Sequence, residues 1–245
     1  MNGASLSSGR IRTTHVGSLI RPPELLQFIR PKQSGQPYDE QAYANCLRES
    51  VAEVVRRQAQ AGIDVPSDGE FGKSISWSQY ALERLSGFER RPARPGAHGF
   101  NRGADRARFA DFYRELDAAE GPPAAVGASA GTAVCSGPIA YTGHAELARD
   151  IENFKSALRQ AGVGEGFLPV ASPTSVIPDR VNEYYKSDRE LLYAIAEAMR
   201  AEYRAIVDAG LMLQLDDARL AVTYDRMVPP ASFADYRNWV AMNVE

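Results

Sequence analysis

Residues 209–217 are Ala209-Gly210-Leu211-Met212-Leu213-Gln214-Leu215-Asp216-Asp217, and this stretch decides the fold class. A glycine that follows a helical pattern can take the left-handed conformation that ends a helix. The apolar run after it predicts a strand that is buried on both faces. The same order of helix, glycine and apolar run recurs at residues 60–65 and 161–170. This alternation indicates βαβ units and a parallel sheet.

Along the whole chain, hydrophobic period and turn residues predict five strands, near Thr13–Gly17, Ile63–Gly69, Thr132–Pro138, Phe167–Ala171 and Leu211–Asp216. Helical periodicity predicts helices from Asp39 to Ala61 and from Ala145 to Ala161. Capping patterns predict two more, which open at Ser187 and Ser232. The Gly-, Pro- and Ala-rich composition near residues 86–131 predicts a long excursion and not a domain boundary, because the βα alternation resumes afterwards.

The number of βα units decides between two α/β architectures. Five units are fewer than the eight that close a barrel, and the last helical pattern continues to Glu245 without a stop signal. We therefore expect an incomplete TIM-type (β/α) barrel over residues 13–245, after a disordered N-terminus over residues 1–12. The competing interpretation is a complete five-stranded flavodoxin-like sheet.

Composition excludes several classes of protein. The chain has 245 residues, of which 44% are hydrophobic and 24% charged, as is usual for globular domains. A net charge of −3 with scattered basic residues argues against a nucleic-acid surface or a membrane patch. No apolar run approaches the length of a membrane span. Two cysteines, Cys46 and Cys135, fit a reducing cytoplasm, and no metal-binding spacing occurs in this chain.

Candidate site residues follow the predicted strands, because the active site of a (β/α) barrel lies at the carboxyl ends of its strands. The first strand is followed by small residues and the second and fifth by acids. The residues at these ends are His15, Gly17, Ser18, Asp68, Glu70, Asp216 and Asp217. Such a gathering of acids and small residues is typical of a small-molecule site.

The ends of four predicted strands, the first, second, third and fifth, resemble motifs of the cobalamin-independent methionine synthase family, which shares a barrel of the uroporphyrinogen decarboxylase-like kind. Thr13–Ser18 is similar to the family's first-strand segment ending in Gly-Ser. Asp68-Gly69-Glu70 is similar to its Gly-Glu segment, and Ser136–Ile139 to its (Thr/Ser)-Gly-Pro turn. Leu213–Asp217 is similar to its Gln-(Ile/Leu)-Asp-(Glu/Asp) segment. The resemblance runs from about Arg12 to the end and is closest to the short, single-barrel members.

The resemblance implies a substrate and a reaction. The family transfers a methyl group from 5-methyltetrahydrofolate to homocysteine and forms methionine. By this resemblance, the backbone of Gly17 and Ser18 would receive the carboxylate of homocysteine, while Glu70 and Asp216 would hold its ammonium. A zwitterion needs N–H donors at one end and acids at the other. No catalytic residue is assigned, and His15, Asp68, His144 and Asp217 are candidates to line the pocket.

The resemblance also implies zinc and no cobalamin. The family's zinc ligands are His, Cys, Glu and Cys on later strands, which we expect beyond residue 245. The 245 residues alone are therefore expected to be inactive, and a complementing C-terminal polypeptide is a candidate partner. Alternative functions are zinc-dependent alkyl transfer to another thiol, such as coenzyme M, and a non-catalytic fragment that needs a partner.

Structural interpretations of the same residues remain open at this stage. Gly17-Ser18 could form a tight turn with a helix cap, and Asp68-Gly69 is a common turn pair. Asp216 and Asp217 could cap the next helix. His15 could hydrogen-bond within the barrel, and His144 could lie at the surface or face the folate.

Overall fold

The computed structural model describes residues 9, 11–73, 79–92, 103–120, 132–176 and 181–245. The chain forms two compact units. The first contains residues 1–80, 143–170 and 202–215, and the second contains residues 81–142, 171–201 and 216–245.

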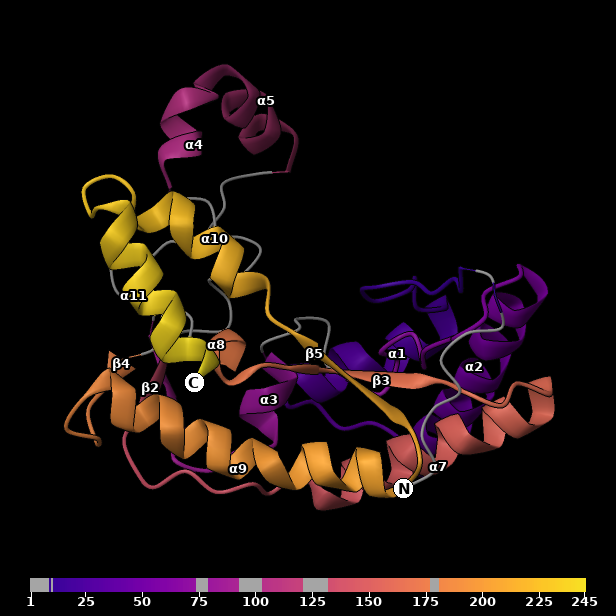
Figure 1. Cartoon of the computed structure of the whole chain (residues 1–245). Coiled ribbons are helices and arrows are strands. Elements are labelled where there is room, and N and C mark those ends of the chain that lie inside the picture. The colour runs from indigo at the N-terminus through magenta and orange to yellow at the C-terminus, as the bar shows by residue number, and fades with distance from the viewer. Residues whose placement is uncertain (1–8, 10, 74–78, 93–102, 121–131, 177–180) are drawn as a thin grey trace. The chain divides into compact units, whose positions relative to one another are not determined.

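Among the described residues, three helices lie wholly in the first unit, namely α1 (Pro23–Gln33), α2 (Glu40–Gln60) and α7 (His144–Ala161). Helices α2 and α7 lie side by side (Figure 1) and bury apolar stripes at helical spacing. Asp39 caps α2 by accepting from the Ala42 N–H at 2.9 Å, and Gly162 ends α7 in the left-handed conformation. The buried stripes include Tyr43, Leu47, Val51, Val55, Phe154 and Leu158.

Parallel strand segments form the other layer of this unit. Thr14 pairs with Val65, and Ser67 pairs with Phe167, in both cases in parallel. Strand β3 (Phe167–Ala171) then pairs with β5 (Met212–Asp216). The Met212 N–H donates to the Gly166 carbonyl at the start of this pair, and the Ser172 N–H donates to the Asp216 carbonyl at its end, so the two strands run parallel.

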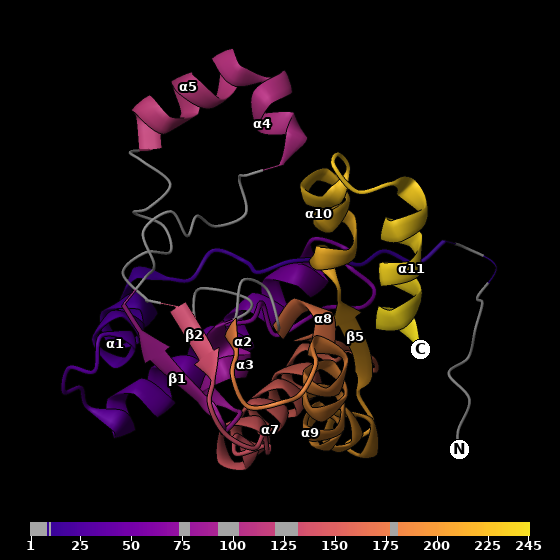
Figure 2. The ribbon, with the colours of Figure 1, turned by 90° about the vertical axis from the view of Figure 1, so that its left-hand side faces the viewer.

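The second unit contains a three-stranded sheet in the order β1 (Phe88–Arg91), β2 (Thr132–Cys135) and β4 (Val181–Asn182). Strand β2 is antiparallel to β1 and parallel to β4. Helices α10 and α11 lie next to each other (Figure 2). The described helices that lie wholly in this unit are α4 (Ala104–Arg108), α5 (Ala110–Glu120), α8 (Pro173–Val176), α10 (Ala218–Met227) and α11 (Phe233–Val244). Two helices, α3 (Gln79–Glu83) and α9 (Asp188–Asp208), are shared between the units.

The structure confirms the four predicted helices and places a strand or a strand bridge in all five predicted strand segments. The capping box predicted at Ser232 is present. The third predicted strand, β2, pairs with β1 and β4 and not with the second or fourth. The count of five consecutive βα units, and with it the domain scheme, therefore remains a prediction. The predicted disordered N-terminus falls largely on residues 1–8 and 10, which lie outside the described residues. Within the described part of the chain, no helix combines the length and hydropathy needed to cross a bilayer.

Candidate functional site

The second strand segment ends in an unusual turn at Asp68-Gly69-Glu70. Gly69 and Glu70 have φ angles of 69° and 61°, so two consecutive residues are left-handed. An Asp68 Oδ1 atom accepts from the Glu70 N–H at 2.9 Å, and the Ser67 hydroxyl accepts from the Gly69 N–H at 3.2 Å. A left-handed residue with a side chain costs about 1–3 kcal/mol and persists at sites where the conformation serves function.

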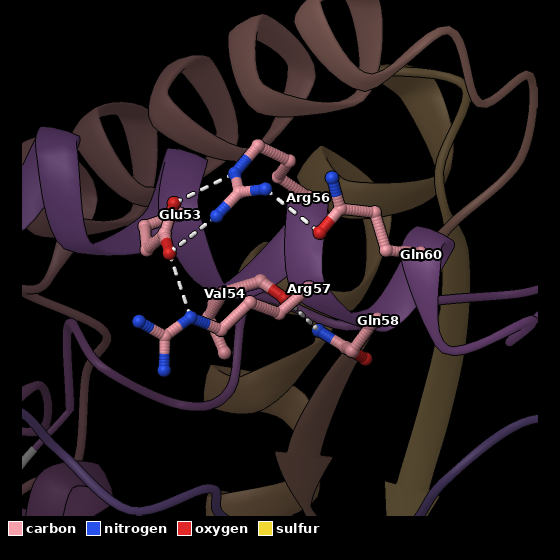
Figure 3. Close-up of polar contacts among 6 residues, drawn as sticks. All are labelled: Glu53, Val54, Arg56, Arg57, Gln58 and Gln60. Atoms are coloured by element: carbon pink, nitrogen blue, oxygen red, sulfur yellow. Dashed lines mark hydrogen bonds and ion pairs between the residues drawn. The ribbon is translucent and has the colours of Figure 1, made fainter.

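The strand that leads into this turn is fixed to α2 by Gln58. Its amide donates to the Ser67 carbonyl at 2.8 Å and accepts from the Ser67 N–H at 3.0 Å. The same amide donates to the Val54 carbonyl within α2 (Figure 3). On the exposed side of this helix, Arg56 and Arg57 form ion pairs with Glu53. The hydrogen bonds from the two arginines lower the pKa of Glu53 to about 2. One face of α2 therefore positions the turn while the other is solvated.

The segment after the first strand lies beside the turn. The Leu19 N–H donates to the Gly69 carbonyl at 3.1 Å. Gly17 is left-handed, with φ of 89°, and the backbone N–H groups of Gly17 and Ser18 make no hydrogen bond within the described part of the chain. Ser18 does not cap a helix, because α1 begins after Pro22. Free N–H groups at such a bend suit an anionic oxygen.

Charged side chains surround the turn in a largely buried setting. Asp68, Glu70 and Lys73 are 3%, 8% and 6% exposed. Burial raises the pKa of Asp68 to about 6, and the positive charge of Lys73 opposes this rise. Burial also lowers the pKa of Arg21, against the charges of Glu70 and Asp68. Arg21 donates to the Glu70 carbonyl at 2.7 Å and so links α1's leading segment to the turn.

Glu70 has the properties of a ligand-binding acid. It is buried and left-handed, and its carboxylate makes no hydrogen bond or ion pair within the described residues. The Glu70 oxygens are not among the buried polar atoms that lack a partner, so the carboxylate reaches solvent and is accessible to a ligand. The turn therefore offers an available acid next to a segment with available N–H groups.

The other predicted site residues have different surroundings. His15 is half-buried, and its Nε2 atom is shielded from solvent without a partner in the described structure. His144 is exposed at the first residue of α7. Asp217 caps α10 by accepting from the Leu220 N–H, as the structural interpretation anticipated. Asp216 is half-buried, its backbone carbonyl accepts from Ser172 and Ser175, and its carboxylate makes no hydrogen bond in the described residues.

Gly17, Ser18, Asp68 and Glu70 all lie in the first unit, as do His15 and His144, whereas Asp216 and Asp217 lie in the second. The backbone bond from Leu19 to Gly69 brings the first two predicted strand ends together. The shared role of Glu70 and Asp216 on one ammonium remains a prediction.

A zinc site does not fit the residues that the structure describes. Among them, no three His, Cys, Asp or Glu side chains cluster closely enough to hold a metal ion. Cys46 is half-buried on α2, and Cys135 is buried on β2, where burial raises its pKa. A zinc-binding cysteine needs the opposite shift, toward the thiolate.

Sequence reasoning missed three residues of this site, namely Arg21, Lys73 and Asp150. Lys73 follows the second strand directly, so its position was a usable signal. Asp150 lies on the apolar stripe of α7 with Leu147 and Phe154, and it is buried. A charge on an apolar stripe is a signal for a buried polar contact. Arg21 shows no comparable sequence signal.

No protein-family model matches the chain. A methionine synthase of Sulfolobus acidocaldarius is 27% identical over 206 residues, which is 84% of this chain and 51% of that protein. A methionine synthase of Saccharolobus islandicus is 24% identical, with 85% and 53% covered. The chain thus spans about half the length of the curated relatives that it matches.

Two solved structures share the fold. A B12-independent methionine synthase from Shewanella sp. W3-18-1, in complex with selenomethionine, has a TM-score of 0.59 and 19% identity, with 87% of this chain and 53% of that chain covered. A putative vitamin-B12 independent methionine synthase from Listeria monocytogenes has a TM-score of 0.59 and 21% identity, with 96% and 62% covered.

These findings define an α/β protein with the fold of the B12-independent methionine synthases, which is of the TIM-barrel kind. Glu70, whose carboxylate makes no hydrogen bond or ion pair within the described residues, follows one of its parallel strand segments. The resemblance predicted from the sequence motifs is confirmed, because the chain is similar in sequence to methionine synthases and in fold to B12-independent methionine synthases.

Proposed function

We propose that this chain provides the homocysteine-binding part of a methyltransferase that forms methionine from homocysteine and a methylated folate. The observation that carries the proposal is Glu70, a buried and left-handed acid whose carboxylate has no partner in the described structure. Methionine synthases are the sequence relatives, and one structural relative binds selenomethionine, which supports an amino-acid ligand.

In the proposed complex, each end of homocysteine meets a group of opposite character. The ammonium binds the Glu70 carboxylate, and Asp216 is proposed as its second acid. The carboxylate binds the N–H groups of Gly17 and Ser18. Charge-assisted hydrogen bonds of this kind fix the orientation of the amino acid, which aims its thiol in one direction.

The reaction itself requires groups beyond those assigned here. Transfer of a methyl group from a tertiary amine needs an activated thiolate and a proton for the leaving nitrogen. The family resemblance implies zinc for the thiolate, but the described residues do not fit a zinc site. We therefore assign binding and orientation to these residues and no step through a metal. The remaining strands of a barrel, from a complementing polypeptide, are part of the same proposal.

Calorimetric titration of the full 245-residue chain with L-homocysteine tests the binding role. We expect Glu70→Gln to weaken binding about tenfold or more, since the ammonium loses its charged partner. Asp216→Asn is expected to weaken it as well. Glu49→Gln is the matched control, because Glu49 is exposed on α2. Equal affinity of the wild type, Glu70→Gln and Asp216→Asn would rule out the ammonium role.

Titration with coenzyme M under the same conditions tests whether the thiol substrate is a sulfonate thiol instead of homocysteine. Its sulfonate carries no ammonium and gains nothing from Glu70. If coenzyme M binds more tightly than homocysteine and Glu70→Gln leaves that affinity unchanged, the substrate is a sulfonate thiol.

A further inference from the structure

Arg21 joins two strand ends through hydrogen bonds to the backbone. Its Nη2 atom donates to the Glu70 carbonyl at 2.7 Å and to the Lys73 carbonyl at 3.3 Å. Both acceptors belong to the turn after the second strand segment, whereas Arg21 follows the first strand segment, shortly after Ser18. Hydrogen bonds from a charged donor are stronger than those between neutral groups. The guanidinium therefore fastens one candidate binding segment to the other.

Glu70 is held on both sides of its left-handed backbone, which has a φ angle of 61°. Asp68 accepts from the Glu70 N–H at 2.9 Å. The Glu70 carbonyl accepts from Arg21 and, at 3.2 Å, from the Lys73 N–H. These bonds fix the peptide groups before and after Glu70 and so oppose the strain of this conformation. Arg21 does so without occupying the Glu70 carboxylate, which makes no hydrogen bond or ion pair within the described residues.

The segment that carries Arg21 also carries the candidate N–H donors of Gly17 and Ser18. The Leu19 N–H of this segment donates to the Gly69 carbonyl at 3.1 Å. A single backbone bond leaves two segments free to rotate about it, and the attachment through Arg21 is a second point that removes this freedom. All of these residues lie in the first unit.

We propose that Arg21 is a positioning residue, whose guanidinium holds the Glu70 turn at a fixed distance from the Gly17-Ser18 segment so that both ends of one amino acid bind at once. This inference rests on the proposed function, in which Glu70 binds the ammonium of homocysteine and the N–H groups bind its carboxylate. Arg21 itself does not contact the substrate. A second interaction adds fully to the first only where the spacing of the two binding groups matches the ligand. Arg21 therefore acts on the combination of the two ends and not on either end alone.

Three ligands separate the two ends of the amino acid. The first is L-homocysteine, the second is 4-mercaptobutyrate, which lacks the ammonium, and the third is 3-mercaptopropylamine, which lacks the carboxylate. NMR chemical-shift titration of the full 245-residue chain measures the affinity of each ligand for the wild type, Arg21→Met and Arg21→Lys. Arg30→Met is the matched control, because Arg30 is exposed on α1.

We expect Arg21→Met to weaken homocysteine binding about tenfold and to change the affinity of the two single-ended ligands less than about twofold. Arg21→Lys should keep part of the homocysteine affinity, because both bonds of Arg21 come from one nitrogen atom that an ammonium can replace. Adding Arg21→Met to Glu70→Gln should have little further effect on homocysteine binding, since the acid that Arg21 positions is already gone.

Three results would overturn the proposal. Equal losses for all three ligands in Arg21→Met would show a general defect of the fold. Losses for homocysteine and 4-mercaptobutyrate alone would show that Arg21 contacts the substrate carboxylate itself. Additive losses in the double variant would show that Arg21 does not act through Glu70. Should Arg21→Met fail to fold, Arg21→Lys repeats the comparison of the three ligands, and its result decides in the same way.

The carbon-13 shift of the Glu70 carbonyl separates this proposal from the proposed function. The shift responds to the hydrogen bonds that the carbonyl accepts, so it should change in Arg21→Met and stay constant in Arg30→Met. A constant shift in Arg21→Met would show that Arg21 does not hold the turn. A wild type that binds no homocysteine would instead overturn the proposed function, and the carbonyl shift would still decide whether Arg21 fixes Glu70.

Discussion

Two strand ends in this chain carry a pair of acids, and their surroundings differ. At Asp216-Asp217, Asp217 caps α10 and the Asp216 carbonyl accepts from Ser172 and Ser175. At Asp68-Gly69-Glu70, Asp68 is buried, Glu70 is left-handed and the Glu70 carboxylate has no partner in the described residues. Helix capping explains Asp217, whereas Glu70 has a left-handed backbone, held by hydrogen bonds to Asp68 and Arg21, and a carboxylate that contributes none of these bonds.

The difference separates an acid that stabilises the fold, Asp217, from an acid that is proposed to bind a ligand, Glu70. A cap stabilises its own helix, so its presence at Asp217 needs no ligand. A left-handed backbone conformation at a residue with a side chain lowers stability by itself, and such strain persists where a ligand uses it.

The largest expected effect is the pH dependence of stability that Asp68 creates. Its pKa is raised from 3.8 to about 6 in the folded state, so the folded state binds more protons between these values. Stability is therefore greatest below the unfolded pKa and falls as the pH rises through about 6. The total change is about 3 kcal/mol. In Asp68→Asn, urea unfolding at pH 4, 5, 6 and 7 should lack this fall.

Asp217→Asn is the control for this measurement, because Asp217 is not buried. It should keep the wild-type fall in stability from pH 4 to 6. If the wild type shows no such fall, or Asp68→Asn retains it, then Asp68 is not the raised acid.

Gly69→Ala is expected to lower the free energy of unfolding by about 2 kcal/mol. Gly69 has φ of 69°, and an added Cβ would lie 3.0 Å from Cε1 of Phe71. Both the conformation and the contact therefore oppose a side chain. Chemical denaturation measures the loss, and Gly164→Ala is the control, since nothing lies within 4 Å of a Cβ there. Equal losses in the two variants would show that the Gly69 turn is not special.

Much of the fold could be predicted from the sequence, because it depends on local patterns. The repeated pattern of a helix, a glycine and an apolar run predicted three strands. The capping pattern that begins at Ser232 predicted the start of α11. Helix α1 was missed because Pro23 and Pro31 obscure its periodicity. The pairing of β2 with β1 and β4 was missed too, since strand partners are set by contacts between distant segments.

The candidate site was only partly predictable for the same reason. Motifs at strand ends indicated Gly17, Ser18 and Glu70, and the structure places the first two next to the turn through Leu19. Burial raises the pKa of Asp68, and so does the charge of Asp150, which is far away in sequence. No sequence pattern encodes a left-handed glutamate, because local preference opposes it.

Glu70→Gly is expected to raise the free energy of unfolding by about 1 kcal/mol, because glycine relieves the left-handed strain. The same change should abolish homocysteine binding in a calorimetric titration. Gain of stability with loss of binding is the signature of a residue kept for function. Loss of both would show that Glu70 serves the fold, and retained binding would remove it from the site.

The smallest expected effect is that of Asp217→Ala, which removes the cap of α10. The hydrogen bond to the Leu220 N–H is long, at 3.3 Å, so the loss should lie near the low end for caps, at about 0.5–1 kcal/mol. Unfolding by urea measures it, and homocysteine affinity should stay at the wild-type value. Asp217→Ser supplies another capping side chain and should recover most of the stability. A Ser variant as unstable as the Ala variant would show that Asp217 does more than cap. A drop in homocysteine affinity in both variants would show that Asp217 lines the binding pocket. The two strand ends would then no longer differ in function.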